Sequence, residues 1–110
     1  MTYQELLEKV KELKFEEVRT DLPTLFEAVT QKDSLKKLTP ILESCFGPPF
    51  KPAGQAPSSR VQEYTAGYGG IRKEQTLYRS EVGSIHTQAM LWPWSDGMHV
   101  TLKILIKDHP

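Results

Sequence analysis

The sequence predicts an α+β domain, in which two or three N-terminal helices pack on one face of a three- or four-stranded antiparallel β-meander. Residues 84–107 alternate apolar and polar side chains around Asp96-Gly97, a dipeptide that favours a tight hairpin turn. Residues 1–47 carry apolar side chains at helical spacing. A proline-rich connector of about 48–59 joins the halves, and neither half has enough apolar surface to fold alone, so we expect one two-layer domain over residues 1–110.

The helical layer should begin at Thr2, because Thr2-Tyr3-Gln4-Glu5 fits a capping box. This helix continues to about Lys14. A second helix is expected over about 21–29, where Thr20 or Asp21 can cap and Pro23 suits the first turn. The apolar residues that share its face are Leu22, Leu25, Phe26 and Val29.

A third helical stretch begins at Asp33 or Ser34 and ends before Gly47. Because Thr39-Pro40 is a good pair for a cap and a first turn, we expect a break or restart there.

The sheet should occupy about 60–107. Its register follows from the alternation of side chains between the two faces of each strand. If Ser95 faces Met98 across the turn, Leu91 faces Leu102, Ala89 faces Ile104 and Thr87 faces Ile106, and these side chains form the core face. A preceding strand, Arg72–Val82, reaches them through a turn at Gly83-Ser84, which pairs Val82 with Ile85. A short strand near 60–66 is a candidate fourth member.

The outer face of this sheet combines aromatic, sulfur-containing and cationic side chains. Such a surface suits a flat ligand, an anionic group or a protein partner. The alternative is that a helix or the connector packs over it. The candidate partner- or ligand-binding residues are Leu77, Arg79, His86, Met90, Trp92, Trp94, Lys103 and Leu105, and the face also carries Lys73, Gln88, His99 and Lys107.

From this surface we expect a small binding or assembly module, not an enzyme, that meets a protein partner or a second copy of itself. Trp92-Pro93-Trp94 either anchors the partner or caps the core. The alternative is a small-ligand-binding protein or small enzyme with a pocket between the helices and the sheet. That pocket would use Tyr64, Tyr78, Ser80 and Thr87. Weak nucleic-acid binding is a third reading, which the net charge of zero disfavours.

The residue spacing predicts no catalytic site, metal or cofactor. His86 and His99 fall several residues apart along the sheet and cannot share a metal. Cys45 lies on an apolar helix stripe, where a buried, inert thiol is expected. The glycines of Ala66–Gly70 precede a strand, so they favour a turn over a phosphate loop, with closure over a small anion as the alternative. A single cysteine and no apolar N-terminal run predict a cytoplasmic protein without a membrane segment.

Overall fold

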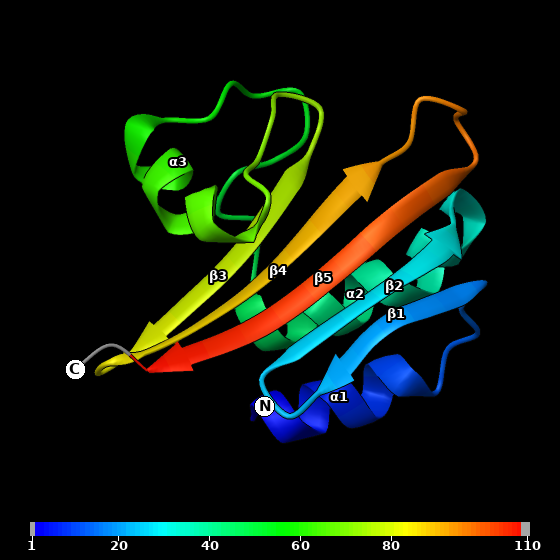
Figure 1. Cartoon of the computed structure of the whole chain (residues 1–110), viewed down its shortest axis with the longest axis horizontal. Helices are drawn as coiled ribbons and strands as arrows, with labels where there is room; N and C mark the ends of the chain where they lie inside the picture. Colours follow the sequence, from blue (N-terminus) through cyan, green and yellow to red (C-terminus); the bar gives the residue numbers. More distant parts are fainter. Residues whose placement is uncertain (1, 109–110) are drawn as a thin grey trace.

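The fold is a five-stranded antiparallel sheet with helices on both faces. The computed structural model describes residues 2–108. The strands are β1 (Glu17–Leu22), β2 (Leu25–Gln31), β3 (Thr76–Val82), β4 (Ile85–Pro93) and β5 (His99–Asp108), in the spatial order β1-β2-β5-β4-β3 (Figure 1). The helices are α1 (Tyr3–Lys11), α2 (Leu35–Phe46) and α3 (Ser59–Thr65), with 3₁₀ turns η1 (Lys32–Ser34) and η2 (Ala66–Tyr68). The α+β class is confirmed, and β3, β4 and β5 form the expected meander, but the sheet has five strands.

The register of the C-terminal strands is the one that parity predicted. Leu91 pairs with Leu102, Ala89 with Ile104 and Thr87 with Ile106. At the other turn Val82 pairs with Ile85, and Gly83 takes a φ of 61°, which glycine adopts without steric cost. The alternation of side chains therefore determined which residues share each face of the sheet.

The predicted second helix over 21–29 is wrong, because these residues form most of the β1–β2 hairpin. Pro23 lies in the turn between Leu22 and Leu25, a place that suits its fixed φ. The apolar side chains of this segment fit a strand as well as a helix. Phe26 pairs with Ile104 of β5, and that tertiary partner decides the outcome.

The predicted break at Thr39-Pro40 is also wrong, because α2 runs through Pro40. Pro40 is exposed, as is Lys36 four residues earlier, so water can satisfy the carbonyl that proline leaves without a donor. Leu38 and Leu42 on the opposite side are fully buried. Their packing outweighs the cost of the proline, which is about 3 kcal/mol in a helix interior.

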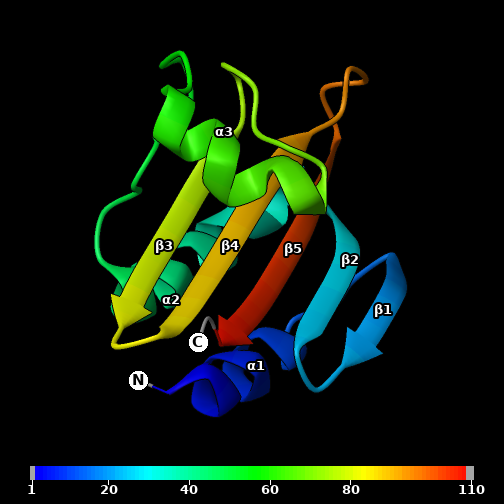
Figure 2. The same cartoon turned by 60° about the vertical axis from the view of Figure 1, so that its left-hand side comes forward.

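The predicted strand near 60–66 is the helix α3. Its N-cap is Ser58, whose Oγ accepts a hydrogen bond from the Val61 N–H at 3.2 Å. Figure 2 shows α3 on the face of the sheet opposite α2, in front of β3 and β4. The two N-terminal helices, α1 and α2, pack on one face as expected, and α3 adds a helix on the other face that the two-layer prediction did not include.

A buried lysine organises the chain before β3. The Lys51 Nζ donates to the carbonyl oxygens of Arg72, Lys73 and Gln75 at 2.8, 2.6 and 2.6 Å, and the side chain is almost fully buried. The Lys51 and Leu77 backbones also exchange two hydrogen bonds at the β3 edge. These contacts hold residues 72–75 in a turn, so β3 begins at Thr76 and not at Arg72.

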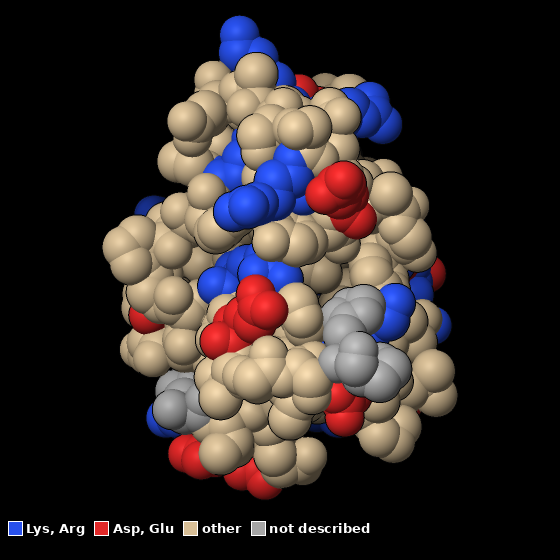
Figure 3. Space-filling model, turned by 90° about the vertical axis from the view of Figure 1, so that its left-hand side faces the viewer, with Lys and Arg blue, Asp and Glu red and all other residues tan. Residues whose placement is uncertain are grey.

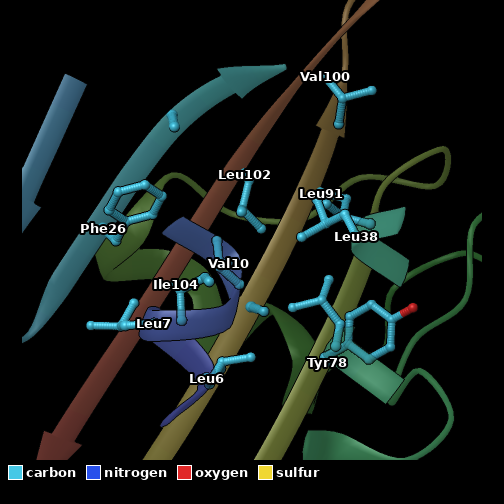
Figure 4. Close-up of a cluster of buried hydrophobic side chains, with 13 residues drawn as sticks. Leu6, Leu7, Val10, Phe26, Leu38, Tyr78, Leu91, Val100, Leu102 and Ile104 are labelled. Atoms are coloured by element: carbon cyan, nitrogen blue, oxygen red, sulfur yellow. The ribbon is translucent and has the colours of Figure 1, made fainter. Parts of the chain in front are cut away.

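The sheet is buried on both sides. On one face α1 contributes Leu6, Leu7 and Val10 to a core that includes residues of β2, β3, β4 and β5 (Figure 4). On the other face a smaller core lies under α3 and η2. It consists of Val61, Ile71, Leu77, Met90 and Leu105, with Leu25, Tyr68 and Trp92 packed against it.

Candidate functional site

Three of the candidate binding residues are not available to a partner. Leu77, Met90 and Leu105 have exposed fractions of 0%, 0% and 2%. They form the smaller core, so the prediction of an exposed apolar patch is wrong and the alternative, packing by a helix, describes this part of the face. The apolar area is covered because Val61 of α3 and Ile71 complete the cluster.

The two tryptophans have different environments. Gly69 packs so close to the Trp92 ring that a Cβ there would lie 2.9 Å from it, and the Lys103 Nζ is 5.5 Å from the centre of that ring. Trp94 is 38% exposed, and its Nε1–H donates to the Thr101 Oγ1 at 2.8 Å. Trp92 therefore covers the smaller core, whereas Trp94 packs partly against the sheet.

The alternative pocket predicted from the sequence is not assembled. Tyr78 is buried in the larger core, on the face that α1 and α2 cover, and its ring centre lies 5.9 Å from that of Phe46 in α2. Ser80 and Thr87 pair with each other on the same face. Tyr64 belongs to α3 on the opposite face, so the sheet separates it from the other three residues.

A cleft of about 490 Å³ opens between the α3–η2 segment and the outer face of β3, β4 and β5. This volume is within the range of about 300–1,000 Å³ that is usual for small-molecule pockets. Figure 3 looks onto this end of the molecule and shows Lys and Arg side chains interspersed with Asp and Glu side chains. The lining residues are Glu63, Tyr64, Gly67, Tyr68, Arg79, His86, Gln88 and Lys107.

Sheet pairing brings the polar residues of the cleft together. Arg79 of β3 pairs with Gln88 of β4, and His86 of β4 pairs with Glu81 on one side and with Lys107 of β5 on the other. The alternation of side chains along the strands puts all five on the outer face of the sheet, as the sequence predicted for Arg79 and His86. The candidate residues that the structure brings together are thus the polar ones.

Arg79 forms the centre of the cleft wall. Its side chain is only 6% exposed, and its guanidinium carbon lies 3.5 Å from the centre of the Tyr64 ring, a cation–π contact. Its Nη1 is 3.2 Å from the Glu81 Oε2, and its Nη2 contacts the His86 Nδ1. The His86 Nε2 in turn lies 3.4 Å from the Glu81 Oε1.

Two buried polar atoms of this wall have no hydrogen-bond partner among residues 2–108. They are the Arg79 Nε, a donor, and the Gln88 Oε1, an acceptor. Gln88 is 4% exposed, and its amide nitrogen donates to the Tyr64 carbonyl at 3.2 Å. Leaving such an atom unsatisfied costs about 1–3 kcal/mol, so each of these two atoms requires an explanation.

Lys103 positions the η2 side of the cleft. Its Nζ donates to the Tyr68 carbonyl at 3.1 Å and lies 3.6 Å from the Glu27 Oε1. The lysine thereby connects η2 to β2 through β5. Lys103 is a positioning residue beside the cleft and does not line it.

A second group of titratable side chains lies at the other end of the sheet. The His99 Nδ1 is 2.5 Å from the Asp96 Oδ2, and its Nε2 is 2.7 Å from the Glu16 Oε2. The hydrogen bond with Asp96 is the main cause that raises the pKa of His99, and Glu16 adds to it. Hydrogen bonds from the Met98 N–H and then from the His99 ring and N–H lower the pKa of Asp96 to about 2. Both ring nitrogens therefore donate from a protonated imidazole, which ties the β4–β5 turn to the segment before β1.

The described part of the chain offers little for metal or thiol chemistry. No group of three or more His, Cys, Asp or Glu side chains within residues 2–108 could hold a metal ion. Cys45 packs against the larger core, on the face that α1 and α2 cover, and burial raises the pKa of its thiol. No helix within the same residues is long and apolar enough to cross a membrane.

Sequence reasoning missed Glu63 because it treated residues 60–66 as a strand, and it considered Gly67 and Tyr68 only as part of a loop that could close over a small anion. A helical signal was present, since Ser58 can cap and Val61, Tyr64, Thr65 and Tyr68 recur at helical spacing.

Comparison of the chain with protein-family models, with curated proteins and with solved structures gives no match.

Proposed function

We propose that the protein is a small-ligand-binding module whose site is the cleft between α3 and the outer face of β3, β4 and β5. The observation that carries this proposal is the pair of buried atoms, the Arg79 Nε and the Gln88 Oε1, that lack a partner in the wall of this cleft. Most buried polar atoms in folded proteins have a hydrogen-bond partner. Among residues 2–108 the Tyr3 Oη and the Trp92 Nε1 also lack one, but a donor and an acceptor on cross-strand neighbours in the wall of one cleft support a small-molecule site.

Binding is favoured over catalysis because the titratable groups of the wall are engaged with one another. Glu81 contacts both Arg79 and His86, and the imidazole bridges the guanidinium and the carboxylate. A general acid or base needs hydrogen-bond access to the reacting group. These side chains instead form a rigid wall, which suits recognition.

A blocking substitution tests the proposal. Gly67 lines the cleft, has open space where a Cβ would lie, and has no positive φ, so Gly67→Phe introduces a ring without backbone strain. Ala66→Phe is the matched control, because Ala66 is exposed and does not line the cleft. The probes are D-glucose, glycerol, inorganic phosphate and acetate, each titrated into ¹⁵N-labelled protein.

We expect at least one probe to shift the Gln88 side-chain amide resonances in wild type and in Ala66→Phe, and to lose this effect in Gly67→Phe. If no probe shifts these resonances in wild type, the cleft is not a ligand site for this range of chemistry and the proposal fails. An equal response in both phenylalanine variants would place the binding elsewhere and would also refute it.

Partner binding at the β4–β5 turn is a second candidate, and exposed apolar side chains favour it. Trp94 and Met98 are 38% and 62% exposed at this turn. Sedimentation of wild type and Met98→Lys over a concentration series tests self-association there. A wild type that remains monomeric at every concentration would exclude it.

A further inference from the structure

The basic residues of the cleft have acidic neighbours. Arg79 and Lys107 line the cleft together with one acidic residue, Glu63, and Glu81 lies beside the cleft on β3. Glu81 already contacts the Arg79 guanidinium at 3.2 Å. An incoming anion would have to displace this carboxylate and would also meet Glu63, and either step costs desolvation or repulsion. These two carboxylates disfavour the anionic ligand that the basic residues alone would indicate.

The open hydrogen-bonding positions identify a different chemistry. The Arg79 Nε–H needs an acceptor, and the Gln88 Oε1 needs a donor, and the two residues are cross-strand partners. A carboxylate offers only acceptors, so it leaves the Gln88 oxygen facing another oxygen. An ammonium group offers only donors. A hydroxyl group both donates and accepts, so one hydroxyl or two neighbouring hydroxyls can satisfy both atoms.

The remaining lining fits the same class of ligand. Tyr64 and Tyr68 line the cleft, and a phenol hydroxyl can both donate and accept. Glu63 offers acceptors and Lys107 offers donors from opposite parts of the lining, α3 and β5. A ligand with several hydroxyls can use donors and acceptors together without carrying charge into the site.

Resting on the proposed function, we propose that the cleft binds an uncharged molecule with neighbouring hydroxyl groups, of the monosaccharide or small-polyol class. The Arg79 Nε–H donates to one hydroxyl oxygen of the ligand, and the Gln88 Oε1 accepts a hydroxyl proton. Glu81 stays on the guanidinium and holds it in place. The selectivity of the site comes from the two buried atoms, which would be left unpaired by an analogue without hydroxyls.

The first experiment compares ligands on the unaltered protein. D-glucose, glycerol and 1,2-propanediol carry neighbouring hydroxyls, 1-propanol carries one, and acetate and inorganic phosphate carry charge. We expect the diol-containing probes to shift the Arg79 Nε and Gln88 amide resonances at lower concentration than 1-propanol does. Glucose against glycerol distinguishes a sugar ring from an open polyol. Binding of an uncharged probe should not weaken with salt, whereas binding of an anion should.

The second experiment removes the acceptor. Gln88→Leu keeps a side chain of similar size but lacks the Oε1, and it should weaken binding of the best diol-containing probe by about 5- to 150-fold, the equivalent of an unmade hydrogen bond in a buried site. Gln31→Leu is the matched control, because Gln31 lies beside Glu16 at the far end of the sheet. A urea unfolding curve for each variant shows that it is folded.

The outcomes separate this inference from the proposed function. If acetate or phosphate shifts the cleft resonances and the uncharged probes do not, the cleft binds ligands but the ligand class is wrong. Diol binding that Gln88→Leu leaves unchanged also overturns the inference. If none of the probes acts on the cleft, the proposed function itself fails.

Discussion

Met90→Ala tests whether the outer face of the sheet is a second hydrophobic core. Met90 has an exposed fraction of 0%, pairs with Leu77 across the strands and packs in the cluster under α3. Truncation of a buried Met to Ala typically costs about 2–5 kcal/mol, from lost burial and from the cavity that remains. For a domain of this size, a loss of about 3 kcal/mol lowers Tm by roughly 12–24 °C. The fold should survive, because domains of this kind are stable by about 5–15 kcal/mol.

Met98→Ala is the matched control, because Met98 is 62% exposed and its truncation should change stability by less than about 0.5 kcal/mol. Both variants are unfolded in urea, and the slope of the unfolding free energy against urea is compared to show that the transition is the same. Equal midpoints for Met90→Ala and Met98→Ala would refute the assignment of a core beneath α3 and would restore Met90 as a surface residue.

Three further predictions concern other parts of the fold. Lys51→Met should lower the unfolding free energy by about 2–4 kcal/mol, because three backbone carbonyls lose a charged donor. Amide exchange in residues 72–77 should also become faster, and unchanged exchange would contradict the prediction. Gly69→Ala should lower the unfolding free energy by about 1–3 kcal/mol, since its Cβ would lie 2.9 Å from the Trp92 ring and its φ of 105° is strained for alanine. An unchanged urea midpoint and unchanged tryptophan emission would contradict this prediction. The stabilisation that His99 provides is present below its unfolded pKa of 6.5 and is lost as pH rises through its higher folded pKa. The stabilisation that Asp96 provides is present above its unfolded pKa of 3.8 and is lost as pH falls toward its folded pKa of about 2. The stability difference between wild type and His99→Gln should therefore be largest between about pH 4 and 6.5. A difference that grows above neutral pH would refute the stabilising role of the His99 contacts with Asp96 and Glu16.

The parts of the fold that could be predicted from the sequence are those that local patterns determine. The β3–β4 and β4–β5 pairings follow from alternation and from two turns, so Ala89 could be placed against Ile104 without a structure. The helix α1 has a capping box at Thr2, and both of its hydrogen bonds are present.

The β1–β2 hairpin could not be predicted in the same way because its apolar residues satisfy two periodicities. Leu22, Leu25, Phe26 and Val29 have helical spacing, yet Phe26 and Ala28 alternate as a strand requires. The free edge of β5 decides between them, and that edge exists only in the folded chain. Tertiary context commonly overrides local preference in this way.

The candidate site was predicted in part. Parity placed Arg79 and His86 on the outer face, which is correct, but it could not show that α3 covers the apolar half of that face and leaves the polar half lining a cleft. Nor could it show that Glu81 neutralises Arg79, because that contact depends on side-chain conformation.

The position of β5 in the centre of the sheet has a consequence for synthesis of the protein. β5 is made after every other strand, yet it is the only strand that joins the β1–β2 hairpin to the β3–β4 hairpin within residues 2–108. At about 5–20 residues per second, the roughly 70 residues between β2 and β5 take several seconds to emerge from a ribosome. During that interval Phe26 and Ala28 have no strand to pair with on their β5 side, and the nascent chain carries an open sheet edge. The chain should therefore acquire resistance to proteolysis abruptly, when residues 99–108 become free to insert between the two hairpins, and not gradually with length.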